Sequence, residues 1–236
     1  IANALLGAWC RFLYRQAHVV TVLSAGFKRL LTERGVPEDR VRVIYNWADE
    51  ATFYPSEPDR ALATALHLDG RFNIVYAGNL GVYQGIDVVI RAAALVKADP
   101  RIQIVIVGIG PLERDLKELA SELQATNVLF LGRRQYEEMP RINSVADVLL
   151  IHLKDRGFLH ATVPGKTQVS LASGRPVLMA ARGEASEIIQ NAGAGLICEP
   201  DQPAAMAKAM LEMAAMPRAQ LDQMGFAPFG EVTRGF

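Results

Sequence analysis

Apolar positions along this chain follow two alternating patterns. Short runs of consecutive apolar residues, typical of strands buried on both faces, alternate with longer stretches in which apolar residues recur every three or four positions. From residue 72 onward the expected strands are 73–77, 102–107, 128–131, 146–152, 176–180 and 195–198. Because helices between parallel strands are crossovers, this order predicts an α/β fold with a doubly wound, Rossmann-like parallel sheet.

The intervening stretches predict the helices of this fold. They are expected over about fifteen residues after Gly85, over 112–124, up to Ser144, from Pro164 onward, over 185–192 and over 203–215. Glycine and proline mark several of their ends, as helix boundaries favour.

A different order of elements precedes residue 72. Residues 1–45 predict a helix over 1–13, a strand at 18–23, a helix at 25–34 and a strand at 42–45. Ser24 is suited to cap the second helix at its N-terminus. Residues 46–71 carry two prolines and several acids, so we expect a linker with one helix there.

Composition narrows the class of protein. The chain has 236 residues, half of them apolar and 21% charged, with a formal net charge of zero. Without a polybasic run, nucleic acid is disfavoured as a partner. Cys10 and Cys198 lack metal-ligand spacing, and buried thiols in a reducing compartment are expected. No apolar run reaches the length of a membrane span and no signal peptide is recognisable, so a cytoplasmic location is expected. Because residue 1 is not Met, we also expect the chain to be a fragment.

Two glycine turns follow the first two predicted strands of the sheet. The first holds Gly78, Asn79, Gly81, Gln84 and Gly85, and the second is Gly108-Ile109-Gly110. Glycines let backbone N–H groups approach an anion, and the carboxyl ends of parallel strands face one crevice. We therefore predict a nucleotide-phosphate cradle, with simple tight connections as the alternative. Neither turn is a G-x-G-x-x-G followed by a ribose-binding acid, which disfavours NAD.

A second candidate segment runs from residue 153 to 187. Pro164-Gly165-Lys166 opens a helix, and a lysine in the first turn opposes the helix dipole unless an anion lies between them. The alternative is an ordinary surface lysine. Glu184 and Glu187, in the first turn of a later helix, are either dipole complements or ligands for sugar hydroxyls. His152 and His160 are either structural or in contact with a ligand, and no nucleophile with its base is recognisable.

The order of eight short motifs resembles one family. YAGNLGVYQG, VGIGP, FLGRR, ADVLLIHLK, VPGK, LASGRPVL, GEASEII and NAGAGLICEP resemble the C-terminal, donor-binding half of retaining GT-B glycosyltransferases of family four (group 1). The bacterial O-antigen, capsule and exopolysaccharide branch is the most similar, and the likeness covers about residues 15–215. It implies a UDP-sugar donor, no cofactor beyond that substrate and no metal ion. It further implies transfer of a hexosyl or N-acetylhexosaminyl unit to a lipid-linked or polysaccharide acceptor.

The same resemblance divides the chain into four segments. Residues 1–45 would be the tail of an N-terminal acceptor domain, with apolar faces left uncovered, and residues 46–71 the interdomain linker. Residues 72–225 would be the nucleotide-sugar-binding domain and 226–236 a truncated C-terminal tail. Peripheral contact with the inner face of the plasma membrane would belong to the missing half.

Carried over position by position, the resemblance assigns roles to individual residues. The family's diphosphate-binding Arg and Lys fall on Asn79 and Gln84, so more of that work is expected of two lysines; its ribose-binding glutamate falls on Val169 and the partner glutamate on Ala161. The predicted catalytic residues are Lys154, Lys166 and Glu184. The predicted donor-binding residues are Gly78, Asn79, Gly81, Gln84, Gly108, Gly110, Arg133, Pro164, Gly165 and Glu187.

These observations favour a fragment of a retaining, metal-independent glycosyltransferase, inactive when isolated. Two alternatives stay open. A non-catalytic nucleotide-sugar-binding module is favoured by the missing glutamate pair at Ala161 and Val169. A UDP-sugar 2-epimerase would share the two-domain fold and would need acids and histidines in its cleft for proton abstraction.

Overall fold

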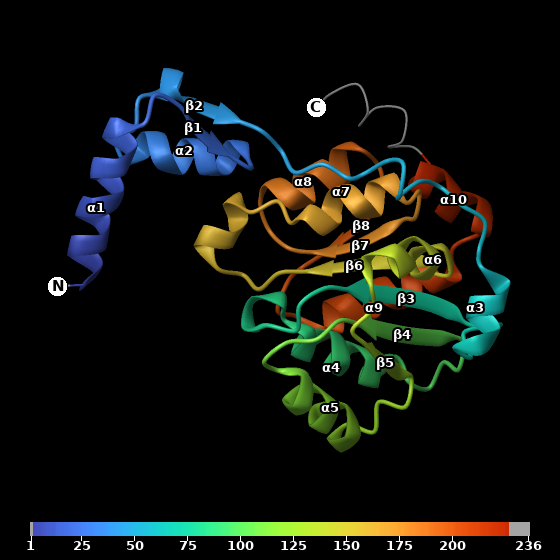
Figure 1. Ribbon diagram of the computed structural model, residues 1–236. Helices are drawn as coiled ribbons and strands as arrows, with labels where there is room; N and C mark the ends of the chain where they lie inside the picture. Colours follow the sequence, from blue (N-terminus) through green and yellow to red (C-terminus); the bar gives the residue numbers. More distant parts are fainter. Residues whose placement is uncertain (1, 227–236) are drawn as a thin grey trace.

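A six-stranded, fully parallel sheet forms the centre of the computed structural model, which describes residues 2–226 (Figure 1). Its spatial order is β5-β4-β3-β6-β7-β8. The strands are β3 (Phe72–Ala77), β4 (Ile102–Val107), β5 (Val128–Gly132), β6 (Val148–His152), β7 (Val177–Ala180) and β8 (Gly195–Cys198). The chain builds outward from β3 in one direction and from β6 in the other, so the switch point lies between them. The predicted doubly wound sheet is confirmed.

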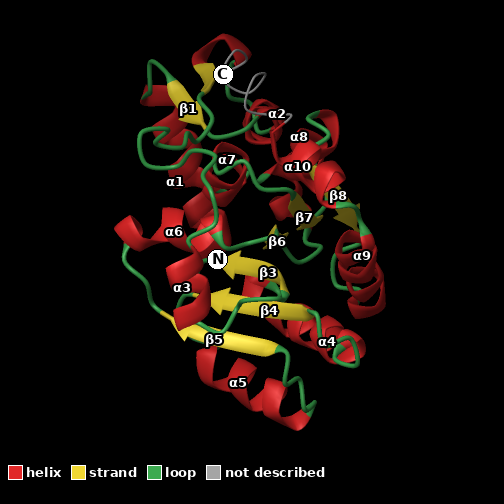
Figure 2. Cartoon of the chain, turned by 90° about the vertical axis from the view of Figure 1, so that its right-hand side faces the viewer, coloured by secondary structure: helices red, strands yellow, loops and turns green. Residues whose placement is uncertain are grey.

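Helices cover both faces of this sheet, because successive side chains of a strand point to opposite faces. Ile74 and Tyr76 of β3 pack with α4 (Ile86–Val96), α5 (Glu113–Glu122) and α9 (Pro203–Ala215). Val75, between them, belongs to the opposite face, which is covered by α3 (Arg60–Ala65) with the turn after it, and by α6 (Met139–Ser144), α7 (Gly165–Ala172) and α8 (Glu184–Asn191). Figure 2 shows β3, β4 and β5 running in the same direction between these helices.

The N-terminal segment, residues 2–45, forms a small unit of its own. It contains α1 (Ala2–Gln16), β1 (Val20–Val22), α2 (Ala25–Glu33) and β2 (Val41–Val43), and its two strands pair in parallel apart from the large sheet. All four predicted elements are present, and Ile1 lies outside the described residues. The α1 helix extends away from the sheet, with exposed Leu5, Trp9 and Phe12 (Figure 1).

Two helices differ from the sequence-based prediction. The helix after the first glycine turn begins at Ile86, as expected, but has eleven residues, shorter than expected, because it ends at Val96 and residues 97–100 turn toward β4. The helix α10 (Arg218–Phe226), which follows Pro217, was not predicted. Apart from Phe226, the predicted tail 226–236 lies outside the described residues.

The glycine turns after β3 and β4 touch each other directly. Gly78 and Gly108 have φ angles of 154° and 135°, which side chains rarely adopt. A Cβ atom at Gly108 would overlap the Gly78 carbonyl oxygen. Backbone contact without intervening side chains therefore holds the ends of the two strands together.

Gly108→Ala tests this contact. Positive-φ strain and the overlap with the Gly78 carbonyl should lower the free energy of unfolding by about 2 kcal/mol or more. Chemical denaturation of both proteins measures the difference. Gly157→Ala is the matched control, because a Cβ there meets no atom within 4 Å, and it should change stability by at most about 1 kcal/mol. Equal effects of the two variants would contradict the close approach.

Candidate functional site

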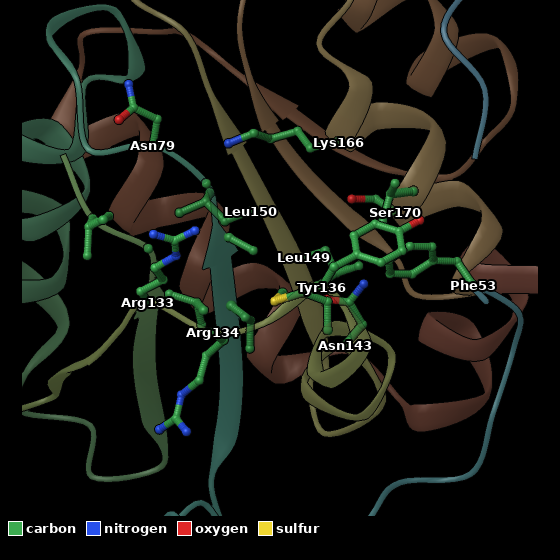
Figure 3. A pocket seen from close by; sticks show the side chains of 18 residues that line it. Phe53, Asn79, Arg133, Arg134, Tyr136, Asn143, Leu149, Leu150, Lys166 and Ser170 are labelled. Carbon is green, nitrogen blue, oxygen red and sulfur yellow. The ribbon is translucent and has the colours of Figure 1, made fainter. Parts of the chain in front are cut away.

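A cavity of about 540 Å³ opens at the carboxyl ends of the central strands (Figure 3). Its walls come from the turns after β3 and β4, the loop after β5, the helices α6 and α7, and the chain leading to α3. The lining residues are Phe53, Val75, Ala77, Gly78, Asn79, Val107, Gly108, Ile109, Arg133, Arg134, Tyr136, Met139, Asn143, Leu149, Leu150, Lys166, Val169 and Ser170. The cavity thus lies at the switch point of the sheet, where α/β proteins bind ligands.

Lys166 extends from the first turn of α7 to the turn after β3. Its Nζ lies 3.9 Å from the centre of the Tyr76 ring and is buried without a hydrogen-bond partner among the described residues. A Cβ at Gly78 would stand 2.5 Å from this nitrogen, so the glycine leaves room for it. Burial lowers the pKa of Lys166 from 10.5 to about 7. The N–H groups of Gly78 and Gly108 donate to the carbonyls of Val107 and Gly132, so the buried, unpaired amine is the group here that is suited to receive an anion.

Lys166→Met should stabilise the empty protein at acidic pH. At pH 6 the wild-type ammonium is charged and unpaired, which costs on the order of 3–5 kcal/mol relative to the unfolded chain, at about 1.4 kcal/mol for each unit by which the pKa is lowered. The unfolded chain holds that proton up to a pKa of 10.5, whereas the folded chain releases it near 7. Wild-type stability should therefore rise with pH between these values, and the advantage of the variant should shrink. Thermal unfolding of both proteins at pH 6 and pH 9 measures this; a pH-independent difference would contradict the assignment.

The opposite end of the cavity is bounded by aromatic side chains. Phe53 is buried and packs edge-on against Tyr136, with ring centres 5.4 Å apart and planes at 80°. Arg133 and Arg134 approach from the loop after β5 (Figure 3), and Arg134 forms an ion pair with Glu138. Cationic groups thus lie beside an otherwise apolar wall.

Sequence reasoning located part of this cavity. The predicted residues that line it are Gly78, Asn79, Gly108, Arg133 and Lys166. Those outside the lining are Gly81, Gln84, Gly110, Pro164, Gly165, Glu187, Lys154 and Glu184. Phe53, Tyr136, Asn143 and Ser170 were missed. Phe53 belongs to the predicted linker, where the sequence offers no periodic pattern that would place it in a cavity wall.

Two residues predicted to be catalytic have other partners in the structure. Lys154 is directed to Asp87, with Nζ 3.3 Å from the carboxylate, and both line a separate depression. Glu184 is buried, and its carboxylate accepts hydrogen bonds from the backbone N–H groups of Ala25 and Gly26, at 2.9 and 2.6 Å, and from the Tyr45 hydroxyl. Glu184 was predicted to face a donor sugar. In the structure its carboxylate instead faces the N-terminal segment and does not line the cavity.

Glu184 instead joins the N-terminal segment to the large sheet. It lies in the first turn of α8 and reaches the first turn of α2, so both helix dipoles favour its charge. Ser24 donates a 2.5 Å hydrogen bond to the carbonyl of Ala161 beside it, and a Cβ at Gly26 would lie 2.8 Å from Ala161. Burial and the bond to Glu184 raise the pKa of Tyr45.

Glu184→Gln should loosen this junction. The variant keeps the side-chain shape but loses the charge that binds two amides, so the free energy of unfolding should fall by about 1–3 kcal/mol. Hydrogen exchange of the Ala25 and Gly26 amides should accelerate. Glu187→Gln, an exposed acid in the same turn of α8, is the control and should shift stability by at most about 0.5 kcal/mol. Unchanged amide protection in Glu184→Gln would exclude the junction.

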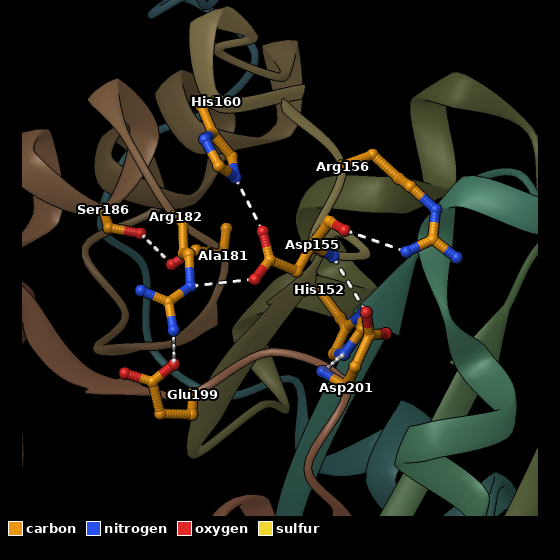
Figure 4. Close-up of polar contacts among 9 residues, drawn as sticks. All are labelled: His152, Asp155, Arg156, His160, Ala181, Arg182, Ser186, Glu199 and Asp201. Atoms are coloured by element: carbon orange, nitrogen blue, oxygen red, sulfur yellow. Dashed lines mark hydrogen bonds and ion pairs between the residues drawn. The ribbon is translucent and has the colours of Figure 1, made fainter. Parts of the chain in front are cut away.

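His152 and His160, considered above as possible ligand contacts, both have partners within the protein (Figure 4). His152 is buried at the end of β6; its Nδ1 lies 3.0 Å from the Gln84 carbonyl oxygen, and its Nε2 accepts from the backbone N–H of Asp201. Burial lowers the pKa of His152, consistent with a neutral ring. His160 contacts Asp155 at 2.7 Å. These bonds brace the loops after β6 and β8.

Arg182 completes this network after β7. It pairs with Asp155 at 3.0 Å and with Glu199 at 2.5 Å (Figure 4). The hydrogen bond from His160, and then the charge of Arg182, lower the pKa of Asp155. Charged side chains from the ends of three neighbouring strands are therefore satisfied by one another.

The fold and the cavity together define a Rossmann-like α/β domain whose switch point holds a cavity with a buried, unpaired lysine. Residues 71–216 match the family described as "Glycosyl transferases group 1". The chain belongs to this family, as its sequence motifs indicated. No helix between residues 2 and 226 has the length and apolar character that crossing a bilayer requires.

Named relatives support this membership. A probable glycosyltransferase WbjE of Pseudomonas aeruginosa is 29% identical over 231 residues, which cover 97% of this chain and 56% of that protein. A D-inositol 3-phosphate glycosyltransferase of Mycolicibacterium gilvum is 31% identical over 185 residues, 75% of this chain and 39% of that protein. The chain thus spans about half the length of the curated relatives it matches.

Solved structures confirm the fold. Anabaena Alr3699/HepE in complex with UDP-glucose superposes with a TM-score of 0.80 at 18% identity, over 92% of this chain and 59% of that one. The C-terminal domain of a glycosyl transferase group 1 family protein (LpcC) from Francisella tularensis superposes with a TM-score of 0.65 at 22% identity. The superposition covers 78% of this chain and 98% of the LpcC domain.

Proposed function

We propose that this chain is the donor-binding part of a retaining glycosyltransferase and that its cavity holds a nucleoside diphosphate sugar. The observation that carries the proposal is the buried, unpartnered Nζ of Lys166 beside Gly78. A diphosphate there would meet the ammonium of Lys166 next to two glycine turns whose backbone permits close approach. Both turns and the lysine lie at the switch point of the sheet.

This arrangement suits the chemistry of glycosyl transfer. Cleavage of the anomeric C–O bond leaves negative charge on the departing diphosphate, and preorganised donors stabilise it. The acceptor can attack from the face that the diphosphate leaves, with a phosphate oxygen taking its proton. A protein nucleophile is then not required. Lys166 would be the principal cation, whereas Lys154 would have to leave Asp87 to contribute.

The relatives support a uridine donor and a saccharide product. The superposed HepE structure contains UDP-glucose, and a further relative is named as a putative colanic acid biosynthesis glycosyl transferase. We extend this to a hexosyl or N-acetylhexosaminyl donor and a lipid-linked or polysaccharide acceptor. Residues 72–225 would bind the donor, 46–71 would form the linker, and 1–45 would continue into an acceptor-binding half with any membrane contact.

The two alternative functions make different demands on the cavity. An epimerase needs an acid or histidine facing its substrate, and none lines the cavity among the described residues. A non-catalytic module needs only binding. Donor hydrolysis or transfer by the full-length protein separates this module from a transferase, because a module would bind UDP without turnover. The chain alone should show no transfer.

UDP binding to this chain tests the proposal. Lys166→Met removes the ammonium from the diphosphate site and should weaken UDP binding at least about tenfold, since a charge-assisted hydrogen bond contributes about 1.5–3 kcal/mol. Isothermal titration of both proteins with UDP at pH 7 measures the change. Lys117→Met, which removes an exposed lysine paired with Glu113, should leave the affinity unchanged. Equal UDP affinity of wild type and Lys166→Met would refute the diphosphate assignment.

A further inference from the structure

The turn after β3, residues 78–85, encloses a buried basic side chain at each of its ends. A Cβ at Gly78 would stand 2.5 Å from the Nζ of Lys166, and a Cβ at Gly85 would overlap the ring of His152. Each glycine thus leaves the space that a side chain from another element occupies. Lys166 comes from α7 and His152 from the end of β6, so two elements hold this turn from opposite ends.

The first half of the turn is fixed by β4 and the turn after it. The backbone N–H groups of Gly78 and Leu80 donate to the carbonyl oxygens of Val107 and Ile109, at 2.9 and 3.0 Å. Asn79, between these two donors, lines the cavity. The half of the turn that reaches the cavity is therefore tied to β4.

The second half of the turn, residues 82–85, is held by β6 and the loop after it. The backbone N–H of Lys154 donates to the carbonyl of Tyr83 at 2.9 Å. The Nδ1 of His152 lies 3.0 Å from the carbonyl oxygen of Gln84. Because the His152 ring is fully buried, its nitrogens depend on protein partners rather than on water.

The partners of the His152 ring determine which nitrogen carries the proton. A carbonyl oxygen can only accept a hydrogen bond, and a backbone N–H can only donate one. Nδ1 must therefore carry its proton toward Gln84, and Nε2 must be unprotonated toward the N–H of Asp201, 3.3 Å away (Figure 4). Asp201 is held in turn, because its carboxylate accepts from the N–H of Asp155 at 2.9 Å. The loop after β8 thus selects the tautomer that anchors the turn after β3.

We propose that His152 is a positioning residue for the anion site and acts without touching the ligand, since it does not line the cavity. As the Nδ1–H tautomer it fixes the second half of the turn, so that Gly78 and Asn79 stay in place beside Lys166. A short turn fixed at both ends has less conformational freedom to lose when a ligand binds. This inference rests on the proposed function, because the site that His152 positions is the proposed diphosphate site.

Two substitutions separate the two hydrogen bonds of the ring. In His152→Asn the amide nitrogen replaces Nδ1 and can still donate to Gln84, whereas His152→Gln extends toward Asp201 and leaves the Gln84 carbonyl without its donor. In UDP titrations at pH 7, the dissociation constant of His152→Asn should stay within about twofold of wild type. That of His152→Gln should rise at least about fivefold. A purely structural role predicts equal effects, because each variant loses the ring and one of its bonds.

His67→Asn is the matched control and should leave the UDP affinity unchanged, because His67 is an exposed histidine in the turn after α3. Equal UDP affinities of folded His152→Asn and folded His152→Gln would overturn the inference while leaving the proposed function intact. Absence of UDP binding by the wild-type chain would overturn both.

The tautomer provides a test on the wild-type chain that does not require His152→Gln to fold. In ¹⁵N-labelled protein at pH 8, long-range ¹H–¹⁵N spectra should show His152 protonated at Nδ1 and unprotonated at Nε2, with its signals assigned by their loss in His152→Asn. A proton on Nε2 in place of Nδ1 would overturn the inference, because the ring could then neither donate to Gln84 nor accept from Asp201.

Discussion

The contact between the turns after β3 and β4 is the constraint on which the site depends. Gly78 and Gly108 meet backbone to backbone, and the space that a Gly78 side chain would fill belongs to the Lys166 amine. Any side chain at Gly108 would separate the turns. The phosphate binding proposed for this chain would therefore depend on the lack of Cβ atoms at these two glycines and on the Lys166 amine beside them.

A second junction connects the site domain to the N-terminal segment. Glu184 lies between the first turns of α2 and α8 and binds amides of the former. Its charge is favoured by two helix dipoles at once, so it acts as a fixed electrostatic link. The close approach of Gly26 to Ala161 leaves no space for a long side chain there. The position where the family places a glutamate therefore serves packing in this chain.

The sequence predicted the sheet well because its buried parallel strands contain short continuous apolar runs, such as residues 148–151, that end at or near polar or glycine residues. It also predicted the meeting of Gly78, Gly108 and Lys166, since strand polarity alone brings these together. It could not separate Lys166 from Lys154, because the Asp87 partner is distant in sequence. Nor could it predict that Phe53 lies in the cavity wall, because the linker has no hydrophobic periodicity from which the course of its backbone could be inferred.

Lysine at position 166 suits an anion site that is sometimes empty. A buried arginine would keep its charge, whereas an amine with a pKa near 7 can release its proton when no anion is present. A diphosphate would restore the charge, so binding above neutral pH must take up a proton at this nitrogen. In the proposed function, the empty cavity would carry less unpaired charge, and the occupied one would hold a full ion pair where the leaving group develops its charge. Ligand binding and protonation of Lys166 would then be coupled.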